Sequence, residues 1–335
     1  MKSKPIPLVK AAFKEQFNTA MLKNGIDPAV YFERVGLPTQ ELDDPESLIP
    51  LLPFRHLANI VAMEENIPDF AAQVAQYTPW HKVASLAPLI SASKTLIELL
   101  TTFCAIAPDQ SSGVSFDFVK NDGFHWFSCN RSIHEHDTQM ELYRITSMIQ
   151  LVQLAAGPRW HPPLIQLHMQ DTQAAYACRL LKNSHIAFLQ AHSRIAVGNT
   201  LLGLPVHLDI PEARTTETRN NVNAGFVESM RSVILTYLSA NSQNANCNID
   251  LIAKAVGLPV RSLQRRLQEH GLKMSDMFNQ AKFEIAHKKL ANQNLSVTEV
   301  AYQMGYSDTS HFTRAFKKMA GMGPNKYRQQ TFTCD

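Results

Sequence analysis

At 335 residues the chain is long enough for two domains with separate cores, and its 45% hydrophobic and 18% charged content excludes a disordered or fibrous protein. Residues 225–335 carry 14 Lys and Arg against 8 Asp and Glu, whereas residues 1–224 carry 18 against 21. A basic C-terminal third behind a slightly acidic body favours a nucleic-acid-binding module attached to another domain.

The cysteines and the apolar segments indicate the cellular compartment. The five cysteines are scattered and form no Cys-x-x-Cys pair, which favours reduced thiols over a disulfide scaffold or a zinc cluster. The N-terminal lysines are followed by no apolar run of signal-peptide length. No stretch approaches the roughly 18 uninterrupted apolar residues that a membrane span needs. We therefore expect a cytoplasmic protein that does not contact a membrane.

Residues 1–210 are expected to form an α+β domain. Helices are expected over residues 8–38, 53–77, 86–106, 143–156 and 172–181, and strands over residues 164–169 and 185–189. Residues 112–119 and 124–130 alternate apolar and polar side chains around Asn121-Asp122-Gly123, which predicts a β-hairpin. The polar stretch from Leu208 to Asn223 contains the expected linker. We place this first domain at 1–210, the linker at 211–222 and a second domain at 223–330.

Histidines in the first domain raise the question of a metal site. His134-Glu135-His136, together with His125 and His161, brings several possible ligands into one domain. Their spacing matches no recognised Cys, His and carboxylate ligand set. We therefore expect neither a metal site nor a cofactor.

Tryptophan–histidine neighbours are the other conspicuous feature of the first domain: Trp80-His81, His125-Trp126 and Trp160-His161. Aromatic and histidine side chains line many ligand pockets, but such residues are more often ordinary, partly buried ones. The ligand-binding residues therefore stay unassigned. The chain contains no Gly-x-Ser-x-Gly elbow, Gly-x-Gly-x-x-Gly fingerprint or P-loop, so we do not expect an enzyme.

Two apolar stripes 48 residues apart mark an internal repeat in the last third of the chain. In each, apolar residues recur at the i, i+3, i+4 and i+7 spacing of an amphipathic helix. The stripe residues are Ile249, Ile252, Ala253 and Val256, then Val297, Val300, Ala301 and Met304. The stripes end at Gly257 and Gly305, since glycine suits the left-handed residue that ends a helix. Asn248 is the expected N-cap of the first helix, and Ser296 with Glu299 predicts a capping box for the second.

A second helix is expected after each glycine, now offset by 49 residues. Leu263 and Leu267 correspond to Phe312 and Phe316 as the inward pair. The outward faces share one spacing and hold Arg261, Gln264, Arg265 and Gln268 in the first copy and Ser310, Thr313, Arg314 and Lys317 in the second. A helix, a tight turn and a helix with a cationic outer face is the helix-turn-helix pattern. A solvated surface explains any single such helix better, but two copies in register favour DNA binding.

A longer helix is expected between the copies, over residues 275–292, with Phe278, Ala281, Ile285, Ala286 and Leu290 on one side. About 18 residues at 1.5 Å per residue span roughly 27 Å. Two recognition helices joined by it would meet the duplex about one turn, ~34 Å, apart. Another apolar helical stripe begins at Phe226 and is expected to pack under the first copy.

The outward side chains match the chemistry of DNA recognition. Arginine can donate two hydrogen bonds to guanine, and glutamine can pair with adenine. Serine and threonine bind either base edges or phosphate oxygens. The first copy offers two arginines and a glutamine, whereas the second offers mostly hydroxyl groups and one arginine. We therefore expect the first copy to carry more of the sequence discrimination and the second more of the anchoring to phosphate.

At these residues the chain resembles the AraC/XylS family of transcription regulators, from about Asn223 to Arg328. The strongest parts of the resemblance are Gly305-Tyr306-Ser307-Asp308, Ser310-His311-Phe312, Arg314-Ala315-Phe316-Lys317-Lys318 and Gly323-Pro324-Asn325-Lys326-Tyr327-Arg328. The resemblance implies base contacts from Arg261, Gln264, Arg265, Thr309, Ser310, His311 and Arg314, to which the outward face adds Lys317. It also implies an all-α C-terminal domain with two helix-turn-helix units joined by a connecting helix.

Two positions depart from the family pattern. Pro259 stands where a capping serine is common, so the first recognition helix is expected to start differently, although proline is acceptable in a first turn. Lys282 stands where an arginine is common on the connecting helix, which puts a structural ion pair there in doubt. More loosely, residues before the linker resemble the arabinose-binding-like N-terminal domain of the longer AraC-type regulators, through their layout and Gly203-Leu204-Pro205-Val206. This likeness does not name the ligand.

The resemblance implies a sequence-specific regulator of promoter DNA, an activator that contacts RNA polymerase rather than a repressor. Its N-terminal domain would bind a small-molecule effector, form a homodimer, or both. Two alternatives remain open. One is an enzyme with a DNA-binding tail, which would need a reactive cysteine among Cys104, Cys129 and Cys178. The other is a ligand-independent regulator whose N-terminal domain only dimerises.

Overall fold

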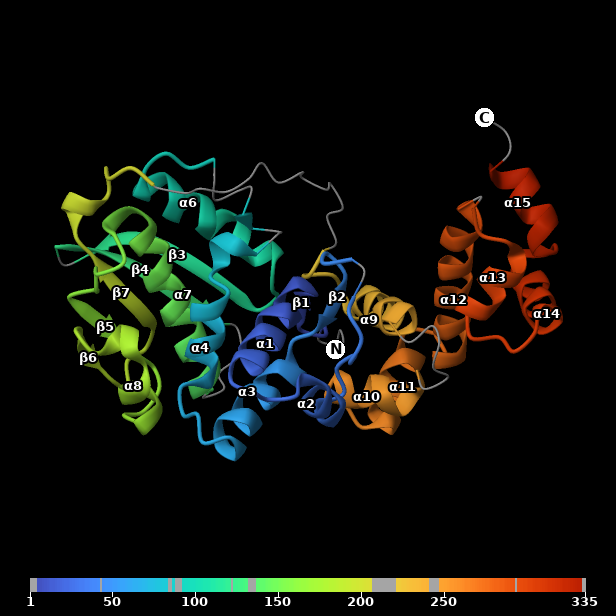
Figure 1. Ribbon diagram of the computed structural model, residues 1–335, viewed down its shortest axis with the longest axis horizontal. Coiled ribbons are helices and arrows are strands. Elements are labelled where there is room, and N and C mark those ends of the chain that lie inside the picture. The colour runs from blue at the N-terminus through green and yellow to red at the C-terminus, as the bar shows by residue number, and fades with distance from the viewer. Residues whose placement is uncertain are drawn as a thin grey trace. The chain divides into compact units, whose positions relative to one another are not determined.

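The computed structural model describes residues 5–42, 44–83, 86–87, 92–121, 123–131, 137–206, 221–240, 247–292 and 294–332. The chain divides into two compact units (Figure 1). The N-terminal unit comprises Pro7–Val35 and Asp44–Asn223, and the C-terminal unit comprises Met1–Ile6, Gly36–Asp43 and Ala224–Asp335. The first mixes helices and strands and the second is helical, which confirms the predicted fold class. No described helix is long and apolar enough to cross a membrane.

The described part of the N-terminal unit contains a five-stranded sheet with the strand order β3-β4-β7-β5-β6 (Figure 1). Its strands are β3 (Val114–Asn121), β4 (Phe124–Arg131), β5 (Leu164–Gln166), β6 (His185–Ala187) and β7 (Ser193–Val197). Neighbouring strands are antiparallel except β5 and β6, which are parallel. The predicted hairpin is confirmed: Asn121 pairs with Phe124, and Gly123 has a φ of 81°. Asp122, the other turn residue, lies outside the described residues.

Helices and a second, two-stranded sheet complete the N-terminal unit. The strands are β1 (Leu8–Lys10) and β2 (Leu48–Pro50), which pair antiparallel. The helices are α1 (Ala12–Lys23), α2 (Pro28–Val35), α3 (Leu52–Glu64), α4 (Phe70–Tyr77), α6 (Leu96–Ile106), α7 (Thr138–Ala156) and α8 (Gln173–Ala177). The predictions for α7, β5 and β6 hold in type, with shorter strands than expected.

Several predicted helices are wrong in extent. Residues 8–38 form a strand and two helices, because the chain takes a positive φ of 73° at Gly25 and restarts at Pro28. Residues 53–77 break in the same way at Asn66, which has a φ of 54°. The helix expected over 86–106 begins only at Leu96, and residues 84–85 and 88–91 lie outside the described residues. Residues 172–181 shorten to α8 and a 3-10 turn.

Helix α7 is buried on nearly all sides because α4 and β7 both pack against it. Its Glu141 is 1% exposed, and a buried carboxylate is costly unless it is hydrogen-bonded. The backbone N–H groups of His168 and Met169 donate to Glu141 at 2.6 Å and 3.0 Å. The Ser193 hydroxyl donates at 2.5 Å. These three donors satisfy the carboxyl oxygens of Glu141 and tie α7 to β7 and to the chain after β5.

The C-terminal unit is built from α9 (Phe226–Ala240), α10 (Ile249–Ala255), α11 (Val260–Glu269), α12 (Met274–Ala291), α13 (Val297–Gln303), α14 (Thr309–Ala320) and α15 (Pro324–Phe332) (Figure 1). The two predicted stripes fall on α10 and α13, and the predicted caps form. Asn248 accepts from the N–H of Leu251 at 2.9 Å, and Ser296 with Glu299 makes the capping box. Gly257 and Gly305 have φ values of 67° and 79°, the conformation expected after a helix.

Helix α12 lies between α9 and the second helix-turn-helix unit. It packs against α9 on the one hand and against α13, α14 and α15 on the other. In the second unit, Ala286 and Leu290 of α12 join the buried cluster formed by Val297, Val300, Ala301, Phe312 and Phe316. The residues predicted to lie between the two helix-turn-helix units therefore form one continuous helix that packs on α9 and completes the core of the second unit.

Candidate nucleic-acid interface

Helix α11 is the second helix of the first helix-turn-helix unit, and it has one apolar face and one polar face. Leu263 and Leu267 are 0% exposed and face the core. The predicted base-contacting residues Arg261, Gln264 and Arg265 are all exposed. The hydrophobic and polar faces are thus separated as the spacing predicts.

The start of α11 is formed by Pro259, the residue that departs from the family pattern. Proline has no side-chain acceptor, so it cannot cap a backbone N–H group as serine does. Its φ of −57° and ψ of 142° nevertheless direct the chain into the helix, and its carbonyl oxygen accepts from the N–H of Leu263 at 3.0 Å. Helix α11 therefore starts without a side-chain cap, unlike α14, which Asp308 caps.

Helix α14 is the corresponding helix of the second unit. Phe312 and Phe316 are buried, with exposed fractions of 1% and 0%. The outward residues Ser310, His311, Arg314 and Lys317 are exposed, and Thr309 is half-buried. The Thr309 hydroxyl donates to the Thr298 hydroxyl of α13 at 3.4 Å. Thr309 is therefore the least available of the predicted base-contacting residues.

Asp308 caps α14, a role that the sequence analysis did not assign. Its Oδ1 atom accepts from the N–H of His311 at 2.8 Å. This hydrogen bond to the carboxylate holds the pKa of Asp308 below its usual range. The His311 ring nitrogen Nδ1 lies 3.5 Å from Asp308 Oδ2, so a protonated His311 pairs with the cap of its own helix. An acidic residue directly before a helix is a pattern that sequence can show.

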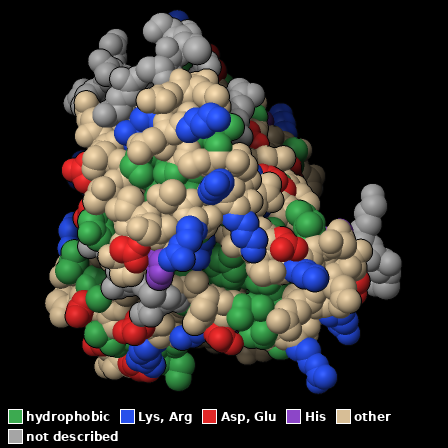
Figure 2. Space-filling model, turned by 90° about the vertical axis from the view of Figure 1, so that its right-hand side faces the viewer, with side chains coloured by type: hydrophobic (Ala, Val, Ile, Leu, Met, Phe, Trp, Pro, Cys, Tyr) green, Lys and Arg blue, Asp and Glu red, His purple; other side chains and the backbone are tan. Residues whose placement is uncertain are grey.

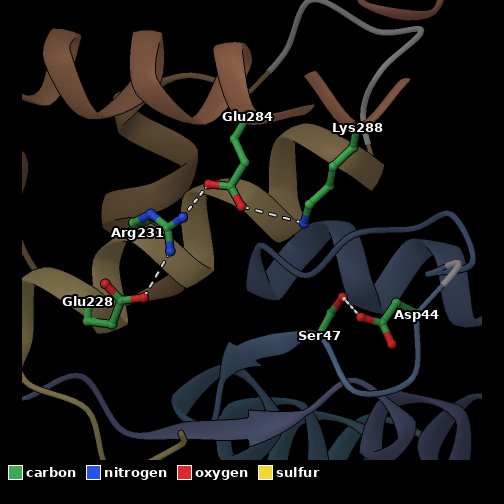
Figure 3. A network of polar contacts seen from close by, with 6 residues as sticks. All are labelled: Asp44, Ser47, Glu228, Arg231, Glu284 and Lys288. Atoms are coloured by element: carbon green, nitrogen blue, oxygen red, sulfur yellow. Dashed lines mark hydrogen bonds and ion pairs between the residues drawn. The ribbon is translucent and has the colours of Figure 1, made fainter. Parts of the chain in front are cut away.

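An ionic network joins α9 to α12 in the C-terminal unit (Figure 3). Arg231 of α9 donates to Glu228 at 3.0 Å and also to Glu284 of α12. Lys288 lies 3.5 Å from the other oxygen of Glu284. No ion pair of Lys282 is found among the described residues. Arg231 and Glu284 form an ion pair between α9 and α12.

Basic residues recur on the face of the C-terminal unit that Figure 2 presents. Lys and Arg side chains are spread over this face, with a few acidic side chains between them (Figure 2). The outward faces of α11 and α14 themselves hold no acidic residue at the i, i+3, i+4, i+7 positions. Such a surface attracts the phosphate backbone of a duplex.

The histidines considered as metal ligands have other partners. His125 Nδ1 lies 2.8 Å from Asn199 Oδ1, and His161 Nδ1 lies 3.2 Å from the carbonyl oxygen of Leu180. His134, Glu135 and His136 lie outside the described residues. Among the described residues, no group of three or more His, Cys, Asp or Glu side chains could hold a metal ion.

The described cysteines of the N-terminal unit are not activated nucleophiles. Burial, with a smaller contribution from Asp117, raises the pKa of Cys104 to about 12. Burial also raises the pKa of Cys178, and Cys129 is 3% exposed. Since the thiolate is the reactive form, these thiols are poorly suited to catalysis.

Two family models match the chain. The model described as "Arabinose-binding domain of AraC transcription regulator, N-term" matches residues 25–206. The model described as "Helix-turn-helix domain" matches residues 252–330, the segment that contains α11 and α14. Together they cover most of the described residues of both units.

Curated relatives include proteins similar over the whole chain and proteins similar only at its end. The HTH-type transcriptional regulator VirS of Mycobacterium tuberculosis is 22% identical over 333 residues, 96% of each chain. The HTH-type transcriptional activator RhaS of Pectobacterium carotovorum is 30% identical over 94 residues, which cover 28% of this chain and 34% of RhaS.

Solved structures with detectable similarity include the transcriptional regulator CdpR of Pseudomonas aeruginosa. It is 15% identical, covers 95% of this chain and 98% of its own, and superposes with a TM-score of 0.41. The DNA-binding domain of AdpA in complex with a target DNA is 19% identical, covers 30% of this chain and 90% of its own, and has a TM-score of 0.26.

Proposed function

The chain belongs to the AraC family of transcription regulators, and from this premise we propose that it activates transcription by binding promoter DNA through the outer faces of α11 and α14. The N-terminal unit responds to a small-molecule effector. The protein acts on promoter DNA, and therefore in the cytoplasm.

One observation carries the DNA-binding proposal. The outward residues of α11 and α14 are polar or basic and mostly exposed. Helix α14 packs directly on α12, and α12 packs on α9, which contacts α10 of the first helix-turn-helix unit. The 18 residues of α12 span about 27 Å at 1.5 Å per residue. Two helices separated by about this length can meet successive major-groove segments about one turn, ~34 Å, apart.

The side chains suggest which bases the first unit recognises. Arg261 and Arg265 can each donate two hydrogen bonds to guanine, and Gln264 can pair with adenine. In the second unit Arg314 is the only guanidinium on the outward face, beside Ser310 and Lys317, which suit phosphate oxygens. We propose that both units bind DNA but divide base recognition unequally.

Activation, rather than repression, is supported by relatives named as activators, RhaS and NphR, each 30% identical over about a quarter of this chain. An activator bound at a promoter contacts RNA polymerase, and we propose the same for this chain. The effector would change transcription by binding one arrangement of the protein more tightly than another, because a ligand shifts a conformational equilibrium only through such a difference. Dimerisation through the N-terminal unit fits the same scheme.

We infer that the chain is not an enzyme. The alternative needs a reactive thiol in the N-terminal unit, whereas burial raises the pKa of both Cys104 and Cys178. Labelling with a thiol reagent at neutral pH tests this inference. Slow labelling supports a regulator, and rapid stoichiometric labelling of one of these cysteines in the folded protein would restore the enzyme hypothesis.

The DNA-binding proposal is tested by alanine substitution of one guanidinium in each unit. Arg265→Ala and Arg314→Ala should each weaken binding to the target promoter by about 1–3 kcal/mol, measured by fluorescence anisotropy with the full chain. Arg179→Ala, an exposed arginine of the N-terminal unit, is the matched control. Equal promoter affinity of Arg265→Ala, Arg314→Ala and the wild type would show that these residues do not contact bases.

A further inference from the structure

The N-terminal unit contains a cavity with a volume of about 90 Å³, several times what one buried water molecule needs. It lies between the start of α1, the helices α6 and α7, and strand β3. Of the eighteen described residues that line it, thirteen are apolar or aromatic. The DNA-binding residues proposed above do not line this cavity.

Aromatic rings form one wall of the cavity. The Trp80 ring stacks on Phe103 with centroids 4.5 Å apart and an interplanar angle of 17°. Phe116 meets both rings edge-on, at 5.5 Å from Trp80 and 5.0 Å from Phe103. Of the three tryptophans that adjoin a histidine in the sequence, Trp80 is the one that lines this cavity. Rings held by mutual contacts form a preformed surface for a flat or branched apolar group.

A short chain of hydrogen bonds uses most of the polar groups at the cavity. Trp80 Nε1 donates to the Tyr143 hydroxyl at 2.9 Å, and that hydroxyl donates to Gln16 Oε1 at 2.6 Å. Gln16 is 2% exposed, and this chain of hydrogen bonds uses its Oε1 atom. An amide also carries two N–H donors, so the Nε2 group of Gln16 can donate to a bound molecule.

Two cationic side chains also line the cavity, and only one of them has an ion-pair partner among the described residues. Lys10 is neutralised by Glu46, whose carboxylate lies 2.6 Å from the lysine Nζ atom. Arg144 lines the cavity but makes no ion pair or hydrogen bond within the described part of the chain. Arg144 and Tyr143 both line the cavity. One uncompensated positive charge therefore remains at this apolar cavity.

We propose that this cavity is the effector site and that it binds a small carboxylate with an aromatic or branched apolar body. The carboxylate pairs with Arg144 and accepts from Gln16 Nε2, while the apolar body packs against Trp80 and Phe103. The inference rests on the proposed effector response and adds the chemical class of the effector. Guanidinium is the group best suited to hold a carboxylate in a partly dehydrated site.

The lining opposes a sugar as the ligand. A pentose carries several hydroxyl groups, each of which needs a hydrogen-bond partner once it leaves water. The Trp80 and Tyr143 groups are already engaged with each other and with Gln16. The remaining wall is mostly apolar, so arabinose would lose more hydrogen bonds to water than it gained.

The test uses the full chain and three probes: phenylacetate, its neutral analogue phenylacetamide, and arabinose. Thermal unfolding and isothermal titration calorimetry report binding, since a ligand of the folded state raises the melting temperature. Phenylacetate should raise it, and Arg144→Met should weaken phenylacetate binding at least tenfold. Phenylacetamide should bind wild type and Arg144→Met equally. Arg159→Met, an exposed arginine outside the cavity lining, should behave as wild type.

A second substitution at the same position shows whether a loss of binding in Arg144→Met comes from the lost charge or from misfolding. Arg144→Lys keeps the charge and should recover part of the phenylacetate affinity. Unchanged phenylacetate binding in Arg144→Met would overturn the inference. Stabilisation by arabinose alone, or no response to phenylacetate at millimolar concentration, would also overturn it.

Promoter binding, measured in parallel, separates this inference from the proposed function. If the chain binds its promoter specifically but binds no carboxylate, the inferred ligand class is wrong and the proposed function as a DNA-binding regulator still stands. Arg144-dependent phenylacetate binding by a chain without specific promoter affinity supports the site and overturns the proposed function.

Discussion

The hydroxyl group of Tyr237 donates a hydrogen bond of 2.8 Å to the carbonyl oxygen of Gly36, a residue 201 positions earlier in the chain. Tyr237 is 0% exposed, and burial raises the pKa of its phenol, so the group remains a donor. Gly36 has a φ of 78°, and a Cβ atom there would lie 3.3 Å from the Lys254 side chain. The segment Gly36–Asp43 is therefore part of the C-terminal unit and not only a loop of the N-terminal half.

Removing the Tyr237 hydroxyl should destabilise the C-terminal unit. Tyr237→Phe leaves the Gly36 carbonyl without this donor in a buried place, which typically lowers the free energy of unfolding by about 1–3 kcal/mol. Urea denaturation of the full chain measures the change. Tyr302→Phe is the control, because Tyr302 is 57% exposed and should lose almost nothing. Equal midpoints for the two variants would mean that the bond contributes little.

The link between α9 and α12 should show a modest coupling energy. Arg231 and Glu284 are both partly exposed, at 35% and 24% of their side chains, so solvent screens their attraction. A double-mutant cycle with Arg231→Met and Glu284→Gln should give a coupling of about 0.5–1 kcal/mol in urea denaturation. The more exposed pair of Glu284 with Lys288 provides the comparison, and its coupling should be smaller. If the effects of Arg231→Met and Glu284→Gln on the free energy of unfolding simply add, the two side chains are not coupled, which would contradict this prediction.

Acid should weaken the start of α14 through Asp308. The pKa of Asp308 is lowered in the folded protein, chiefly by the N–H of His311. The stabilisation is therefore complete above the ordinary pKa of about 3.9 and is lost as the pH falls through the depressed folded value. Unfolding curves of wild type between pH 2 and 5 should show this loss. Asp308→Asn keeps an acceptor but cannot titrate, so the contribution of this cap to the pH dependence should disappear. An unchanged pH dependence in Asp308→Asn would assign the effect to other carboxyls.

Lys317 should act through phosphate rather than through bases. Lys317→Ala is expected to weaken binding to promoter and to unrelated DNA by similar factors and to reduce the slope of log affinity against log salt by about 1. Anisotropy titrations at several salt concentrations measure both quantities. Lys182→Ala, an exposed lysine of the N-terminal unit, is the control. A loss confined to the promoter sequence would instead make Lys317 a base-contacting residue.

The two halves of the operator should differ in their tolerance of base changes. The first unit offers Arg261, Gln264 and Arg265, whereas the hydroxyl of Thr309 in the second unit is engaged with Thr298. Single base-pair substitutions across the site, scored by footprinting, should therefore cost more affinity opposite α11 than opposite α14. Equal sensitivity in both halves would refute this division.

The sequence predicted the C-terminal unit well because its signals are local. The stripes, glycines and caps of α10 and α13 each lie within a few residues of one another, and the family resemblance drawn from residues such as Gly305 and Phe316 is confirmed by the matching models. The strand β7 was missed because most of its five residues are buried and show no alternation of polar and apolar side chains.

The candidate effector cavity could not be predicted from sequence because distant residues create it. Trp80 reaches Tyr143 across 63 positions, and Tyr143 reaches Gln16 across 127. Sequence can show that a tryptophan adjoins a histidine, but not which tryptophan meets a tyrosine. Whether Arg144 is neutralised likewise depends on the packing of α7 and not on its neighbours in the chain.

Helix α12 has a consequence for the evolution of the promoters that this protein recognises. Because α12 packs on α9, which contacts α10 of the first helix-turn-helix unit, and also supplies core side chains to the second unit, one unit cannot turn relative to the other without disrupting packed contacts. Base substitutions can accumulate gradually in either half of an operator, but an inserted or deleted base pair between the halves rotates one of them by about a tenth of a turn of the duplex. We therefore expect operators of this protein to diverge in sequence while keeping a constant spacing.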